Sequence, residues 1–92
     1  MGENSTITIT KGDTLILEVN ASGHNLYVKT NQSTGTGSAV TTGITNNGTA
    51  SGTITWDTTS VSAGTYYYNC VNHATMNGII VVEPTPSPTT IV

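Results

Sequence analysis

Four side chains with metal-binding donor atoms stand out from an otherwise plain sequence. Cys70, His73 and Met76 lie close together in the segment CVNHATM (70–76), and His24 lies far upstream in GHN (23–25). The chain has no other cysteine or histidine, and its second methionine is its first residue. A site could therefore draw on one thiolate, two imidazoles and one thioether.

This set of donors suits copper better than other metals. Sulfur ligands favour copper(I) or zinc, and a trigonal set of two His and one Cys with a weak axial Met is typical of electron-transfer copper sites. Zinc usually takes Cys, His and carboxylate ligands rather than Met. Two residues separate Cys70 from His73, and two more separate His73 from Met76, so a tight loop can bring these donors to one ion. The sequence predicts one copper ion bound by His24, Cys70, His73 and Met76.

Alternating apolar and polar residues predict six or seven short β-strands that must position these donors. The expected strands cover residues 6–10, 15–20, 26–30, 52–56, 65–70 and 79–82, and the long connection 31–50 holds at most one short edge strand near Val40 or Ile44. Cys70 ends one strand, while His73 and Met76 are expected in the loop before the last strand. No window has helical periodicity.

The expected fold is all-β, a Greek-key antiparallel β-sandwich. Strands from opposite sheets can end at one pole of a sandwich, which allows His24 to reach Cys70. We expect one domain over residues 1–83. The remaining residues, 84–92, are rich in Pro and Thr, which favours an extended backbone and predicts a linker or tail.

Composition excludes several classes of protein. The 92 residues suffice for one domain, only 8% are charged, and the net charge is -3. The only basic residues, Lys11 and Lys29, cannot form a surface that binds phosphates, so we expect no nucleic-acid partner. No run approaches the ~20 apolar residues of a membrane span. A single cysteine excludes an internal disulfide and zinc sites built on two or more thiolates.

The segment GTYYYNCVNH (64–73), followed by MNG (76–78), resembles the copper-loop signature of the cupredoxins, the type 1 blue copper proteins that include plastocyanin and amicyanin. The two-residue gaps are similar to the short loop of the amicyanin type. KGDT (11–14) and GHN (23–25) resemble the early strand turn and the first-histidine motif of the family. The resemblance covers most of residues 6–82 and is weak over 31–50. It implies a cupredoxin-like fold with one type 1 copper ion.

The resemblance also implies roles for individual residues. His24 and His73 would be the imidazole ligands, Cys70 the thiolate and Met76 the long axial ligand. Asn25 would tether the two ligand loops and thereby orient the ligands and tune the metal. Many relatives have Pro where this chain has Asn72. Because Pro lacks an N–H, Asn72 would restore a donor toward the Cys70 sulfur and raise the reduction potential.

One-electron transfer, rather than enzymatic catalysis, is the function that the resemblance implies. Trinuclear copper oxidases flank the cysteine with histidines, whereas here the flanking residues are Asn69 and Val71. An exposed His73 would pass the electron to a redox partner protein docked beside it. We expect a monomer located in the periplasm or outside the cell, where thiolate sites load more easily. Residues 1–4 carry no apolar signal segment, as expected if a signal was removed.

Other functions stay open on the sequence alone. A Thr- and Gly-rich sandwich with a Pro-rich tail also suits a structural or adhesion module of a larger surface or virion protein, in which copper is a stabiliser or a relic. Copper storage is a third reading. A nucleophile and base pair of Cys70 and His73 is disfavoured, because no orienting third group is apparent. Several segments, NGT (47–49) among them, match the N-glycosylation pattern, and chance explains these matches in a chain so rich in Asn, Ser and Thr.

Overall fold

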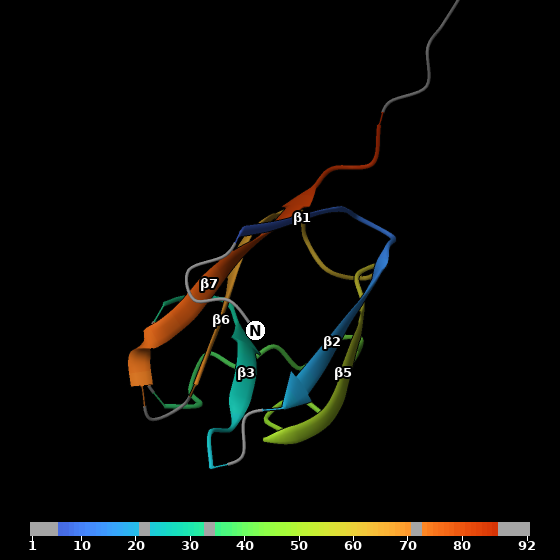
Figure 1. Cartoon of the computed structure of the whole chain (residues 1–92). Coiled ribbons are helices and arrows are strands. Elements are labelled where there is room, and N and C mark those ends of the chain that lie inside the picture. The colour runs from blue at the N-terminus through green and yellow to red at the C-terminus, as the bar shows by residue number, and fades with distance from the viewer. Residues whose placement is uncertain (1–5, 21–22, 33–34, 71–72, 87–92) are drawn as a thin grey trace, which may run out of the picture.

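The computed structural model describes residues 6–20, 23–32, 35–70 and 73–86, and for residues 73–77 it describes the backbone only. Within these ranges there are strands and no helix, which confirms the predicted all-β class (Figure 1). The strands are β1 (Thr6–Thr10), β2 (Thr14–Asn20), β3 (Leu26–Lys29), β4 (Ile44–Thr45), β5 (Ser51–Asp57), β6 (Gly64–Cys70) and β7 (His73–Glu83). After β7, residues 84–86 are exposed and have no regular structure.

The strands form two sheets that face each other, so the predicted β-sandwich is confirmed. One sheet has the order β1-β7-β6-β3 and the other the order β2-β5-β4 (Figure 1). Every pair is antiparallel except β1 with β7, which is parallel and aligns Thr6 with Ile79. Parallel strands need a long connection between them. Because β1 and β7 are the first and last strands, all the strands between them make up that connection.

The core lies between the sheets and consists of the inward residues of each strand. Ile54 and Trp56 on β5 are completely buried, as their alternation with threonine predicts. Tyr68 on β6 is 3% exposed, and the partly buried Tyr66 packs its ring edge-on to Trp56 with 4.9 Å between ring centroids. The indole N–H of Trp56 donates to the Thr42 carbonyl oxygen at 3.1 Å. The core is therefore centred on one large aromatic side chain.

The last strand is longer than the sequence indicates. Residues 71–77 are predicted to be a loop, whereas the backbone from His73 onward belongs to β7. The pairing is irregular there, because Cys70 lies opposite His73 while Asn69 lies opposite Asn77. Residues 74–76 thus form an extra length of chain on the β7 side, an enlarged bulge. Their sequence, ATM, has no apolar alternation from which a strand could be predicted.

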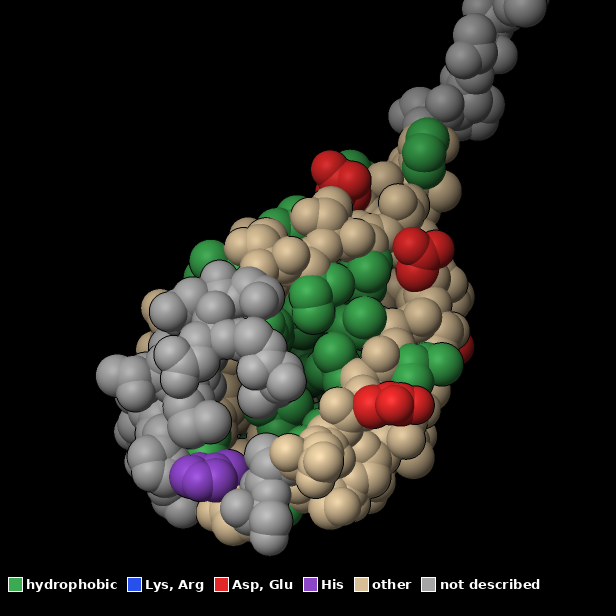
Figure 2. Space-filling model, in the orientation of Figure 1, with side chains coloured by type: hydrophobic (Ala, Val, Ile, Leu, Met, Phe, Trp, Pro, Cys, Tyr) green, Lys and Arg blue, Asp and Glu red, His purple; other side chains and the backbone are tan. Residues whose placement is uncertain are grey.

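The end of the sandwich away from Cys70 is closed by the turn between β1 and β2. The Asp13 carboxylate accepts from the Thr10 backbone N–H at 2.9 Å, and the Thr58 hydroxyl donates to the Asp13 carbonyl oxygen at 2.7 Å. This turn carries the chain from one sheet to the other, so β1 and β2 do not pair. Apolar side chains show in the hollow between these two strands in Figure 2.

Gly43 lies where the connection before β4 touches the end of β5, and its replacement should destabilise the fold. Gly43 has φ +70°, its carbonyl oxygen accepts from the Asp57 N–H at 2.8 Å, and a Cβ there would overlap the Asp57 carbonyl oxygen. We expect Gly43→Ala to lower the free energy of unfolding by at least about 2 kcal/mol, because left-handed backbone strain adds to the overlap. Urea unfolding measures this.

Gly37→Ala is the matched control, because a Cβ at Gly37 meets nothing within 4 Å. Its free energy of unfolding should stay within about 0.5 kcal/mol of the parent. Equal stability of the two variants would contradict this account of the connection.

Candidate metal centre

Two of the predicted ligands come together at one end of the sandwich. His24 immediately precedes Asn25 and the start of β3, and Cys70 is the last residue of β6. The two strands pair so that Leu26 lies opposite Cys70. His24 is partly buried, and Cys70 is 1% exposed. The sheet register therefore brings an imidazole to a buried thiol from a distant part of the sequence.

The distance between these donors fits a shared metal ion. His24 Nδ1 lies 3.4 Å from Cys70 Sγ. An ion about 2.3 Å from a thiolate sulfur and about 2.0 Å from an imidazole nitrogen would hold these atoms about 3.5–3.7 Å apart, for angles between tetrahedral and trigonal. Only a few tenths of an ångström separate the observed distance from that range. The residues present thus fit a metal that takes sulfur and imidazole ligands.

The remaining predicted site residues are described only in part. The strand register sets His73 opposite Cys70, and Met76 lies in the adjoining bulge of β7. The side chains of His73 and Met76 lie outside the described part of the structure, as does Asn72 altogether. Within the described residues, no three His, Cys, Asp or Glu side chains gather as a metal site. The full four-ligand set and the role of Asn72 stay predictions.

Asn25 anchors the segment that carries His24. Its side-chain amide donates to the Gly48 carbonyl oxygen at 2.7 Å. Beside it, the Leu26 N–H donates to the Thr49 carbonyl oxygen and the Gly48 N–H donates to the Leu26 carbonyl oxygen. These bonds fix the start of β3 to the turn before β5. The tether to the second ligand loop that the family resemblance implies for Asn25 stays a prediction.

Removing this anchor should weaken copper binding. In Asn25→Ala the chain next to His24 loses its bond to Gly48, so ordering the imidazole on binding costs more. We expect copper affinity to fall about 10-fold, the lower end for residues that support a ligand. Competition with a chelator of known affinity measures the change.

Thr59→Ala is the control for this comparison. It removes a similarly exposed bond, from the Thr59 hydroxyl to the Asp57 carboxylate at 2.7 Å, at the other end of the molecule. Its copper affinity should equal that of the parent. An equal loss in both variants would mean that Asn25 acts through general stability alone.

Asn47 is a supporting residue that sequence reasoning missed. Its side-chain oxygen accepts from the Val28 N–H at 2.8 Å, and its amide donates to the carbonyl oxygens of Val28 at 3.1 Å and Val40 at 3.0 Å. The side chain thus ties β3 to the segment around Val40, which also bridges β3 through Lys29 and Ala39. The sequence shows Asn47 only as part of a chance glycosylation pattern, because these contacts depend on tertiary structure.

Three acidic side chains lie away from the candidate metal centre. Asp13 lies in the β1–β2 turn, Asp57 pairs with Thr14, and Glu83 pairs with Thr10. All three acids are therefore at the end opposite Cys70. A fourth described acid, Glu18, is exposed and lies opposite Thr53 in the half of β2 nearer His24.

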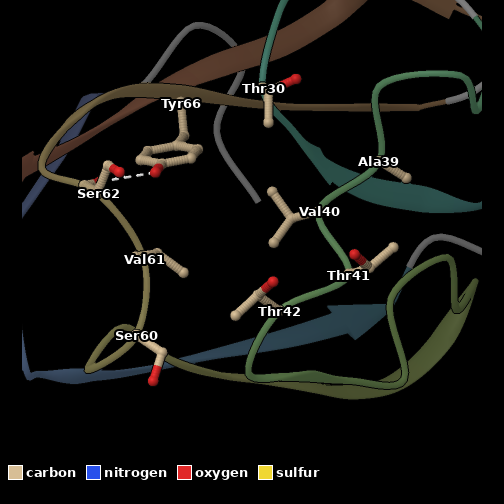
Figure 3. Close-up of a pocket in the computed structure, with 9 residues that line it drawn as sticks. All are labelled: Thr30, Ala39, Val40, Thr41, Thr42, Ser60, Val61, Ser62 and Tyr66. Atoms are coloured by element: carbon tan, nitrogen blue, oxygen red, sulfur yellow. Dashed lines mark hydrogen bonds between the residues drawn. The ribbon is translucent and has the colours of Figure 1, made fainter.

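A separate pocket opens between the long connection and the residues before β6. Its volume is about 280 Å³, and the Tyr66 hydroxyl donates to the Ser62 carbonyl oxygen at 2.6 Å at its rim (Figure 3). It is lined by Thr30, Ala39, Val40, Thr41, Thr42, Ser60, Val61, Ser62 and Tyr66. None of these is a predicted site residue, so the pocket is not part of the metal centre.

Comparison with known proteins identifies the family. Residues 3–83 match the model of a family described as copper binding proteins of the plastocyanin/azurin family. Searches of curated proteins and of solved structures each found no match. Within the described residues, no helix is long and apolar enough to cross a membrane. The match covers the whole sandwich, including the segments of His24 and Cys70, and the chain therefore belongs to the plastocyanin/azurin family of copper-binding proteins, with copper as its cofactor.

Proposed function

We propose that this protein is a type 1 copper protein that carries single electrons, with His24, Cys70, His73 and Met76 as ligands. The observation that carries the proposal is the 3.4 Å approach of His24 Nδ1 to the buried Cys70 Sγ. Membership of a copper-binding family supports it. We further propose that the copper-binding domain spans residues 1–83 and that 84–92 form a linker or tail.

The described residues can do what rapid electron transfer requires of a protein. A bound copper ion supplies the one-electron couple between copper(I) and copper(II). Cys70 is held by the ladder between β3 and β6 and is closed off from water, with Leu26 opposite it at 2% exposure. Asn25 fixes the segment on which His24 lies, and Asn47 holds β3 at Val28. Ligands fixed in this way move little when the charge of the site changes, which keeps the reorganisation small.

We propose that the electron leaves through the ring of His73 to a redox partner protein, and that the domain acts as a monomer without enzymatic activity, in the periplasm or outside the cell. The partner would meet a surface of low charge, since three of the four described acids, Asp13, Asp57 and Glu83, lie at the other end of the sandwich.

Voltammetry of the copper-loaded protein tests the proposed function. We expect a reversible one-electron couple whose oxidation and reduction waves remain close together as the scan rate rises. A structural module with relic copper would bind copper without such a couple. Copper storage would give tight copper(I) binding and no reversible wave. Either result would contradict electron transfer.

A further inference from the structure

A buried ammonium group lies on the strand next to the candidate ligand strand. Lys29 is the last residue of β3 and is 0% exposed. Lysine is almost never fully buried in proteins, because removing its charge from water costs free energy. The chain has one other cation, Lys11, at the opposite end, where its Nζ donates to the carbonyl oxygens of Thr59 and Val61.

The strand register places Lys29 near Cys70 without direct contact being needed. Leu26 lies opposite Cys70 and Lys29 lies opposite Tyr67, three residues further along the same pair of strands. At the rise of a β-strand this offset is about 10 Å along the strands. Val28 is completely buried in the core, so its neighbour Lys29 projects from the other face of the sheet. Lys29 is therefore not placed to be a ligand, and any effect of it on the site must come through its electric field.

The intervening material is protein and not water. Cys70 is 1% exposed, and the strands between it and Lys29 carry the buried side chains of Val28 and Tyr68. Opposite or like charges interact more strongly through such a medium than through solvent. Desolvation lowers the pKa of Lys29 below its ordinary value of 10.5, and attraction to a Cys70 thiolate opposes this shift in part.

We propose that the buried positive charge of Lys29 raises the reduction potential of the copper site. The proposal rests on the electron-transfer function proposed above. The oxidised site carries one more positive charge than the reduced site, so a fixed cation nearby disfavours the oxidised state more. Burial of Lys29 costs stability, but it keeps the charge from being screened. An exposed lysine at the same distance would be screened by salt.

Two neutral variants test this proposal, Lys29→Met and Lys29→Gln. We expect each to lower the ratio of reduced to oxidised protein at a fixed applied potential by about three- to tenfold. For a one-electron couple this equals a shift of roughly 30–60 mV to lower potential. The shift should persist in 1 M salt, because the charge is buried. Lys29→Arg, which keeps the charge, should stay near the parent potential.

Lys11→Met is the matched control, since it removes the same charge at the far end of the sandwich. Its potential should equal that of the parent. The proposal is overturned if the Lys29 variants match Lys11→Met, or if their shift disappears in 1 M salt. Absence of a reversible couple in the parent protein overturns the proposed electron-transfer function instead, so the two failures are distinct.

Discussion

Replacing Cys70 by serine should abolish the copper site while leaving the sandwich folded. Serine keeps the shape of the side chain but is not ionised near neutral pH, so the thiolate ligand is lost. Mutation of a residue that merely supports a metal ligand lowers metal affinity about 10- to 100-fold. Loss of the ligand itself should lower it more than 100-fold. The intense visible absorption from thiolate to copper should vanish as well. Chelator competition and the visible spectrum measure the two effects.

The metal-free variant provides the control for Cys70→Ser. Cys70 is 1% exposed, so a hydroxyl there costs about 1–3 kcal/mol of stability if it finds no partner. The domain should still unfold in one cooperative transition in urea. Copper affinity and visible absorption equal to those of the parent would show that Cys70 is a core residue and not a ligand.

Replacing Trp56 by alanine should remove much of the stability of the domain. Trp56 is completely buried, lies opposite both Leu15 and Ile44 in its sheet, and packs against Tyr66 from the other sheet. Truncation of a buried tryptophan costs about 3–5 kcal/mol. The total free energy of unfolding of a small domain is only about 5–15 kcal/mol. The free energy of unfolding in urea should fall by a large fraction.

Two further variants separate the contributions at this position. Trp56→Phe keeps most of the ring but loses the bond to the Thr42 carbonyl oxygen, and should cost about 1–2 kcal/mol. Ile16→Ala removes an apolar side chain that is 60% exposed and should change stability by less than about 0.5 kcal/mol. A Trp56→Ala variant as stable as Ile16→Ala would show that the core is not centred on Trp56.

Much of the fold could be predicted because period-two alternation is a local signal. The runs around Ile7, Leu17 and Ile54 each gave a strand with the expected inward face. The parallel pairing of β1 with β7 could not be predicted, because neither strand carries in its own sequence a sign of its partner or direction. The extension of β7 back to His73 was missed since the ATM segment lacks alternation.

The residues of the candidate site, like the strands, could be predicted only in part. Residue types identified His24 and Cys70, because few other side chains in this chain could bind copper, and the structure brings these two together. Asn47 and Lys29 could not be found from sequence. One acts through backbone contacts of a neighbouring strand edge, and the other is buried by packing although its strand pattern suggests a surface lysine. The roles of both residues depend on tertiary contacts, which cannot be recognised from residue types alone.

Titration of the metal-free protein with copper(II), followed by visible absorption and run in parallel on His24→Ala, tests most directly whether two distant segments share one metal. We expect an intense thiolate-to-copper band in the parent that stops growing at one equivalent, and a band that is lost or strongly changed in His24→Ala. A parent protein without the band, or a His24→Ala spectrum identical to that of the parent, would contradict a metal ion shared by the two segments.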